Sequence, residues 1–142
     1  MKRQILAATI LAAVIVSGPG FISAGAAKPY RRSCINKPFV AHRRAYGFFP
    51  AAGRNYSVNQ EPMIAARLDA LGKALRLHLI GISGYRTPQH SVAVGGYAGD
   101  PHTRGEASDT LGVERVPEST LESFCLTRPF AGAREADHIQ EL

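Results

Sequence analysis

The chain has 142 residues, 45% apolar and 20% charged, which is typical of one globular domain and excludes a largely disordered protein. Its 14 glycines and 9 prolines argue against a helical bundle. The formal net charge is +6, but the basic residues form no recognised nucleic-acid-binding motif, so we expect no nucleic-acid partner.

The first 26 residues are predicted to be a signal peptide for export. Lys2 and Arg3 precede an apolar run over residues 5–16, and small residues at 24–26 provide a cleavage site. As a helix the run would span about 18 Å, which is too short for a bilayer core of about 30 Å and argues against a membrane anchor. We therefore expect a protein that is secreted, periplasmic or associated with the cell wall, with no transmembrane segment after the signal is removed.

Residues 27–56 are predicted to form a basic N-terminal arm. The stretch from Lys28 to Arg54 holds seven Lys or Arg residues and no acid, and it has no sustained hydrophobic period. We interpret it as extended chain with an edge strand near Cys34. On an exported protein such an arm would attract anionic cell-wall polymers. The alternative is a solvated segment that keeps the protein soluble.

The two cysteines, Cys34 and Cys125, are predicted to form a disulfide, because an even pair outside the cytosol normally does. The bond would close a loop of about 90 residues, worth at most about 4–5 kcal/mol. Zinc ligation by the pair is the alternative, but no Cys-x-x-Cys spacing supports it.

Residues 57–142 are predicted to form an α+β domain, in which a small antiparallel sheet packs with one main amphipathic helix and long loops form the site. The helix begins after an Asn59 N-cap with Pro62 in its first turn. Its apolar stripe follows helical spacing, and the charged residues off the stripe are expected to be solvated. The stripe is Ile64, Leu68, Leu71 and Leu75, and the charged residues are Arg67, Asp69, Lys73 and Arg76.

The rest of the domain is predicted to be strands around a long irregular stretch. We expect strands near 77–83, 109–113 and 138–142, and a short helix at 118–124. Residues 84–108 are rich in Gly and Pro, and an irregular stretch of that length in a small domain is usually functional or disordered.

Several side chains in and after this stretch suggest a metal site. His102, Asp109 and His138 would make a three-ligand zinc shell that leaves a position for water, and Glu135 could accept a proton from that water. With 5 His and 11 acids in the chain, such a set can also arise by chance.

The order of the surrounding motifs resembles the zinc D-alanyl-D-alanine carboxypeptidase and dipeptidase family, whose fold is shared with hedgehog signalling domains. The resemblance runs from about Val58 to the C-terminus. Five segments carry it: SGYRTP at 83–88, VGG at 94–96, HTRGEASD at 102–109, RPF at 128–130 and EADH at 135–138.

The resemblance implies a role for each matching residue. His102, Asp109 and His138 would bind Zn²⁺. Glu135 would be the general base, and Arg86 would stabilise the oxyanion that forms on the scissile carbonyl. Peptidoglycan peptides would be the substrate.

Three features depart from the family pattern or compete with it. Asp100 replaces a Ser two positions before the first ligand, and it would place another carboxylate beside the metal. Strict carboxypeptidase specificity is therefore in doubt, and an endopeptidase is possible. Several relatives have Asn where Ser91 stands. Asp137 competes with Glu135 for the role of base, although a side chain next to a ligand on a strand should point away from the metal.

Three functions follow from this pattern. We expect an exported zinc peptidase, a hydrolase of the D,D-carboxypeptidase type. The first alternative is a non-catalytic module of the same fold that binds cell-wall peptides. The second is a basic, disulfide-linked exported protein whose resemblance to the family is incidental.

Overall fold

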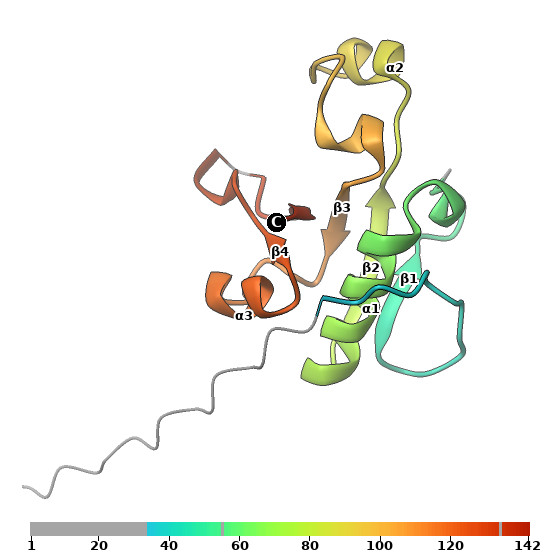
Figure 1. The fold of residues 1–142 in the computed structure, drawn as a ribbon, viewed down its shortest axis with the longest axis vertical. Helices are drawn as coiled ribbons and strands as arrows, with labels where there is room; N and C mark the ends of the chain where they lie inside the picture. Colours follow the sequence, from blue (N-terminus) through green and yellow to red (C-terminus); the bar gives the residue numbers. More distant parts are fainter. Residues whose placement is uncertain (1–33, 55, 134) are drawn as a thin grey trace, which may run out of the picture.

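The computed structural model describes residues 34–142, apart from residues 55 and 134. The predicted signal peptide and residues 27–33 of the predicted arm lie outside the described residues. The described strands are β1 (Gly47–Pro50), β2 (His78–Ser83), β3 (Ala107–Leu111), β4 (Leu126–Thr127) and β5 (His138–Glu141). They form one sheet in the order β1-β2-β3-β5-β4 (Figure 1).

Helices and short 3-10 turns connect these strands. The described helices are α1 (Pro62–Leu75), α2 (Pro88–Ala93) and α3 (Glu118–Ser123), and the 3-10 turns are η1 (Val58–Gln60), η2 (Pro101–Arg104) and η3 (Ala131–Ala133). The stretch 84–108 is therefore less irregular than predicted, because α2, η2 and the start of β3 lie within it. None of the described helices is both long and apolar enough to cross a membrane.

The sheet is mostly antiparallel, which confirms the α+β prediction. Strand β1 differs, because it pairs with β2 in parallel. Parallel neighbours need a crossover connection, and α1 supplies it. The other described pairs, β2–β3, β3–β5 and β4–β5, are antiparallel.

Helix α1 supplies much of the core. Ile64, Leu68 and Leu71 are fully buried on the predicted stripe, where they join Phe48 of β1 and Leu79 of β2. The helix begins at Pro62, whose missing N–H costs nothing in the first turn. Asn59 lies in η1 and is not the N-cap, so that prediction is wrong.

Two charged residues of α1 are not on a solvated face. Asp69 is 8% exposed; it forms ion pairs with His42 and Lys73 and accepts a hydrogen bond of 3.1 Å from the Phe48 amide. Arg67 is half-buried and pairs with Glu141 at 3.0 Å. The helical period marks these positions as polar, but segments from elsewhere in the chain cover them.

The segment expected to be an extended arm contributes to the sheet. Its strand lies at Gly47–Pro50 and not near Cys34, and Phe48 is fully buried in the core. The chain before this strand runs across α1 (Figure 1). Phe39 packs against the core cluster there, and its amide bonds to the Pro62 carbonyl at 2.9 Å.

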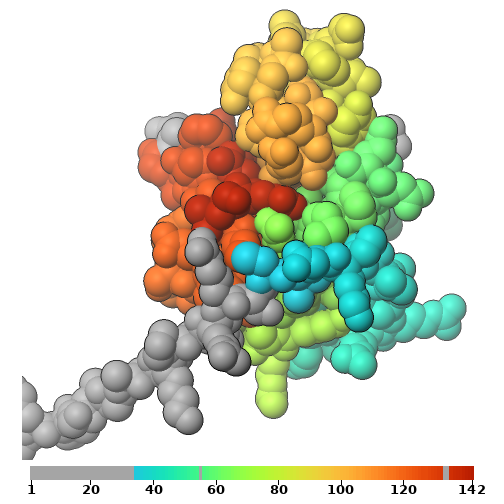
Figure 2. Space-filling model, in the orientation of Figure 1, coloured from blue at the N-terminus to red at the C-terminus, as the bar shows by residue number. Residues whose placement is uncertain are grey.

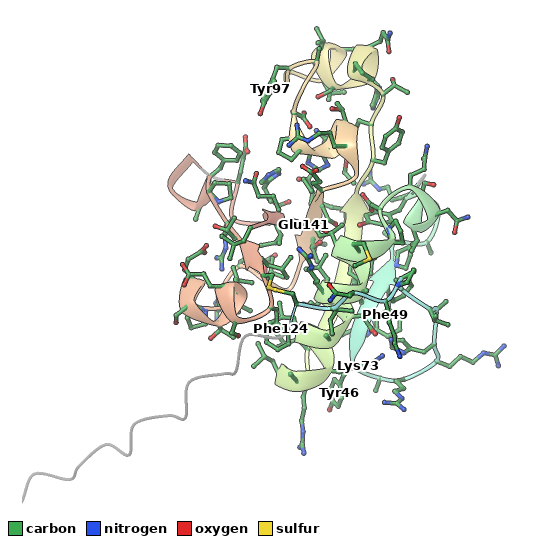
Figure 3. All side chains as sticks on the ribbon, in the orientation of Figure 1. Tyr46, Phe49, Lys73, Tyr97, Phe124 and Glu141 are labelled. Carbon is green, nitrogen blue, oxygen red and sulfur yellow. A yellow bond between two sulfur atoms is a disulfide. The ribbon has the colours of Figure 1, made fainter. Side chains whose placement is uncertain are left out.

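The predicted disulfide is confirmed. Cys34 and Cys125 are bonded, with their Cα atoms 5.4 Å apart in space and the two residues 91 positions apart in the sequence. Figure 3 shows the bond in yellow. It fastens the beginning of the described chain to the segment between α3 and β4.

Candidate functional site

His102 is held rigidly at the start of η2. The Asp100 side chain caps this turn by accepting a hydrogen bond of 2.7 Å from the His102 amide. His102 is 2% exposed, and its Nδ1 lies 2.8 Å from the Gly84 carbonyl. Because a carbonyl can only accept, Nδ1 carries the proton and Nε2 is left as the ligand atom, the arrangement typical of metal-binding histidines.

Sheet register brings Asp109 and His138 together. Asp109 of β3 is the direct partner of His138 on β5 and of Ser83 on β2. Asp109 Oδ1 lies 3.2 Å from His138 Nδ1 and 3.3 Å from His102 Nε2. The two imidazole nitrogens, His102 Nε2 and His138 Nδ1, are 3.3 Å apart.

These three residues fit a zinc ion. Within the described part of the chain they form a group whose ligand atoms all lie within 4.8 Å of one another. Tetrahedral zinc with bonds of about 2.0–2.1 Å places its ligand atoms about 3.3 Å apart, which agrees with all three separations. The donor set of two imidazoles and one carboxylate also suits zinc and leaves one coordination position for water or substrate.

The protonation states of the ligands suit a cation. Burial would raise the pKa of Asp109, but its contacts with the His102 and His138 imidazoles and the charge of Arg86 hold it well below its ordinary value. The carboxylate is therefore ionised at neutral pH. Burial would lower the pKa of His138, but its bond to Asp109 raises it, so without metal a proton competes for this imidazole.

Arg86 lies behind Asp109 and holds its outer oxygen. Its Nη2 pairs with Asp109 Oδ2, and its Nε and Nη2 donate to Ser83 Oγ at 3.1 and 2.9 Å. Asp109 is thus oriented with Oδ1 toward the imidazoles and Oδ2 toward the guanidinium. Arg86 also lines the cavity at the ligands, so it can contact a bound molecule.

A cavity of about 540 Å³ opens over the three ligands. Residues 94–97 and 100–102 form one wall, and the segment from Phe130 to His138 contributes the other. In Figure 2 these are the yellow-to-orange and red segments. Tyr97, labelled in Figure 3, lines this cavity and is 60% exposed.

Glu135 and Asp137 both line this cavity. The His138 amide bonds to the Glu135 carbonyl at 3.2 Å, which closes a turn and brings Glu135 beside the ligand. The strand geometry from which Asp137 was expected to point away from the metal is not present at this position. The two-faced alternation holds within a strand, but Asp137 lies in the turn before β5 begins at His138.

Asp100 is part of the cavity wall but not of the ligand group. Its Oδ2 accepts a hydrogen bond from Ser91 Oγ, and Oδ1 caps η2. Burial would raise the pKa of Asp100, but these two bonds lower it, so the carboxylate stays charged. The two departures from the family pattern, at positions 91 and 100, therefore contact each other.

A second cavity of about 380 Å³ lies on the other side of Arg86. His90 and Tyr85 line it, together with Ser57 and Gln60. His90 does not line the cavity over the ligands, so it is not placed to act on a molecule bound there.

Sequence reasoning missed Glu61, whose carboxyl is 1% exposed. Burial raises its pKa to about 8, the ionised Asp109 also acts to raise it, and Arg86 acts to lower it. The sequence feature that could have drawn attention to Glu61 is its position immediately before Pro62. That pattern, however, favours an ordinary helix start.

Comparison with known proteins adds one finding. A family model described as Peptidase M15 matches residues 43–140. Searches of curated proteins and of solved structures gave no match.

Proposed function

Because this chain belongs to the M15 peptidase family, we propose that it is an exported zinc peptidase acting on D-amino-acid-containing stem peptides of peptidoglycan. The family is of the zinc D-Ala-D-Ala carboxypeptidase type. The observation that carries the proposal is the ligand group: His102, Asp109 and His138 lie at tetrahedral spacing under a cavity that three further carboxylates line.

A zinc ion held by these residues would polarise the scissile carbonyl and acidify the attacking water. The chain's own contribution is to fix the ligands. The Gly84 carbonyl sets the His102 tautomer, and Arg86 sets the direction of Asp109. Holding the ligands in place in advance avoids reorganisation during the reaction.

We assign the general base to Glu135. It is exposed, and it lines the cavity three residues before a ligand. It takes a proton from the attacking water as the water oxygen bonds to the carbonyl carbon. It then gives that proton to the amine nitrogen as the C–N bond breaks.

Arg86 contributes positive charge where the carbonyl oxygen becomes negative. One guanidinium nitrogen is engaged with Asp109, and the planar fork offers further N–H donors toward the cavity. Such a donor stabilises the tetrahedral state more than the planar ground state, which is what accelerates the reaction.

Charge in the cavity bears on which bond is cut. Asp100, Glu135 and Asp137 line it together with the ligand Asp109, whereas Arg86 brings one positive charge, already paired. This balance disfavours a free substrate carboxylate close to Asp100. Cleavage within a stem peptide or cross-bridge therefore competes with release of a terminal D-alanine.

The basic residues before β1 support attachment to anionic wall polymers. Lys37, Arg43 and Arg44 are exposed among the described residues. Such polymers would hold the enzyme near its substrate through salt-sensitive attraction.

Zinc content and wall-peptide hydrolysis measured together test the proposal. We expect about one zinc per chain and hydrolysis that a strong chelator abolishes, and His102→Ala should lose both. Glu135→Gln should keep zinc and bind peptide without turnover, which separates an enzyme from a binding module. Hydrolysis that persists after complete removal of metal would refute the proposal.

A further inference from the structure

The most unusual buried group outside the ligand set is the Glu61 carboxyl. Glu61 is the N-cap residue of α1, yet its side chain makes no capping bond. Among the described residues, no hydrogen bond of normal geometry reaches either carboxyl oxygen, although the Tyr56 hydroxyl and the Tyr85 N–H act on the carboxyl and lower its pKa. Burying a carboxyl in this way is unfavourable, and an apolar side chain of similar size would fill the space at lower cost.

Two motif glycines make room for this residue. A Cβ atom on Gly84 would lie 2.0 Å from Glu61 Oε1, and one on Gly105 would lie 2.2 Å from the Gln60 carbonyl oxygen. No real Cβ approaches another atom so closely. The segment Gln60–Glu61 is therefore enclosed between the two segments that carry Arg86 and the ligands His102 and Asp109.

A single peptide group connects Glu61 with His102. The carbonyl of Gly84 is the acceptor for His102 Nδ1 at 2.8 Å. The N–H of that same peptide group belongs to Tyr85; it forms no hydrogen bond of normal geometry with the Glu61 carboxyl, but it lowers the pKa of that carboxyl. Since a peptide group is planar and rigid, a group that holds its N–H also fixes the direction of its C=O.

Gly84 makes such a restraint necessary. A glycine has no side chain to limit its backbone angles, so the peptide that follows it is free to rotate unless a neighbour holds it. Glu61 is the side chain in contact with this position. The segment that begins at Gly84 is held again two residues later, where the Arg86 amide donates a hydrogen bond of 3.3 Å to the His102 carbonyl.

We propose that Glu61 is a positioning residue for the metal-binding site, which acts through the Gly84–Tyr85 peptide to hold the His102 ring with Nε2 toward Asp109 and His138. The inference rests on the proposed function, because it presumes that these three residues bind zinc. With a pKa of about 8, Glu61 is mostly neutral at pH 7. It acts by its contact with Gly84 and by its polarity toward the Tyr85 N–H, both of which Gln can reproduce.

The test is the zinc affinity of the folded protein, measured by competition with a chromophoric chelator. Glu61→Gln keeps the acceptor and should bind zinc within about threefold of the wild type. Glu61→Leu keeps the volume but removes the acceptor, and we expect affinity 10–100-fold weaker, the loss typical of partners that orient a ligand. Wild-type affinity in Glu61→Leu would overturn the inference.

Asp69→Leu is the matched control. It removes the other buried carboxyl of α1, which contacts His42, Lys73 and the Phe48 amide, none of which lines the ligand cavity. It should lower the melting temperature and leave the zinc affinity of the folded fraction unchanged. An equal loss of zinc affinity in Asp69→Leu would show that general destabilisation, not positioning, accounts for the effect.

Two further measurements keep the inference testable if Glu61→Leu does not fold. Glu61→Asp keeps the polarity but is one methylene too short to reach the peptide, so it should also weaken zinc binding. In the metal-free protein, the His102 ring should be a single Nδ1–H tautomer by ¹⁵N NMR in the wild type and a mixture in Glu61→Asp. Wild-type behaviour in both would refute the inference, whereas a wild type that binds no zinc would refute the proposed function and the inference with it.

Discussion

The hydroxyl of Ser91 donates a hydrogen bond to Oδ2 of Asp100, the residue that caps the turn carrying His102. Both side chains are buried and come from segments nine positions apart. The resembled family usually has Ser at position 100, and several relatives have Asn at position 91. This chain therefore has its hydroxyl at position 91 and its carboxylate at position 100. The resembled family has the hydroxyl at position 100 and, in several relatives, an amide at position 91.

This exchange predicts compensation. Ser91→Ala leaves a buried carboxylate oxygen without its donor, which should lower the free energy of unfolding by about 1–3 kcal/mol. Asp100→Ser alone should be milder, because Ser also caps helical turns. The double variant Ser91→Asn, Asp100→Ser should recover much of any loss in chemical denaturation, and strict additivity of the single changes would contradict the pairing.

Glu135→Gln and Asp137→Asn distinguish the two carboxylates that line the cavity. Gln keeps shape and hydrogen bonding but cannot take a proton, so kcat should fall by about 10²–10⁴ while zinc content is unchanged. Asp137→Asn should reduce kcat far less. Steady-state kinetics with both variants decides the assignment, and the opposite ranking would make Asp137 the base.

Arg86→Ala should impair both metal binding and catalysis. It removes the partner of Asp109 Oδ2 and the donor for the developing oxyanion, so we expect kcat about 10²–10³-fold lower and zinc bound about 10–100-fold more weakly. Arg86→Lys should recover a part, because an ammonium lacks the planar fork. Arg104→Ala is the control, since Arg104 is exposed and pairs with Glu106. Unchanged kcat and zinc affinity in Arg86→Ala would contradict both roles.

Reduction of Cys34–Cys125 should lower the melting temperature without removing zinc. The bond closes a long loop, so the chain-entropy model gives at most about 4–5 kcal/mol, and neither cysteine lines the ligand cavity. Thermal unfolding with and without reductant, together with metal analysis, tests this. Two titratable thiols in the natively produced protein would contradict the bond.

The raised pKa of Glu61 predicts that the free energy of unfolding of the metal-free protein depends on pH. Its pKa is about 8 when folded and about 4.5 in the unfolded chain, so between these values the folded state keeps a proton that the unfolded state has released. Stability should therefore fall as the pH rises from about 4.5 to 8, by on the order of 4 kcal/mol at most. Glu61→Gln should flatten that slope in denaturation curves, and an unchanged slope would show that Glu61 does not titrate in this range.

The motifs that carry the candidate metal ligands were predictable because the residue types within each short motif identify them. His102, Asp109 and His138 lie in short ordered segments that a family pattern identifies, and a strand register then joins two of them. The amphipathic stripe of α1 was equally visible, since burial of one face sets its period.

What the sequence did not reveal depends on contacts between distant segments. The helical period places Asp69 among the solvated positions, but His42, 27 positions earlier, covers it. In the sequence, Glu61 has the position of an ordinary residue at a helix start. In the structure it is enclosed by Gly84 and Gly105, which lie more than 20 and more than 40 positions later in the chain. The strand at Gly47–Pro50 is short and lacks alternation, so its pairing is decided by α1 and β2 rather than by its own pattern.

The pairing of Asp109 with His138 also couples the candidate metal site to the register of the sheet. If β5 slipped by one residue against β3, every side chain of β5 would change faces, so His138 would leave the cavity and Ile139 would leave the core. Such a misaligned chain could not assemble the three ligands. An ion that binds the correct alignment alone would draw the folding population toward it, so zinc would select the sheet's register as well as serve the chemistry.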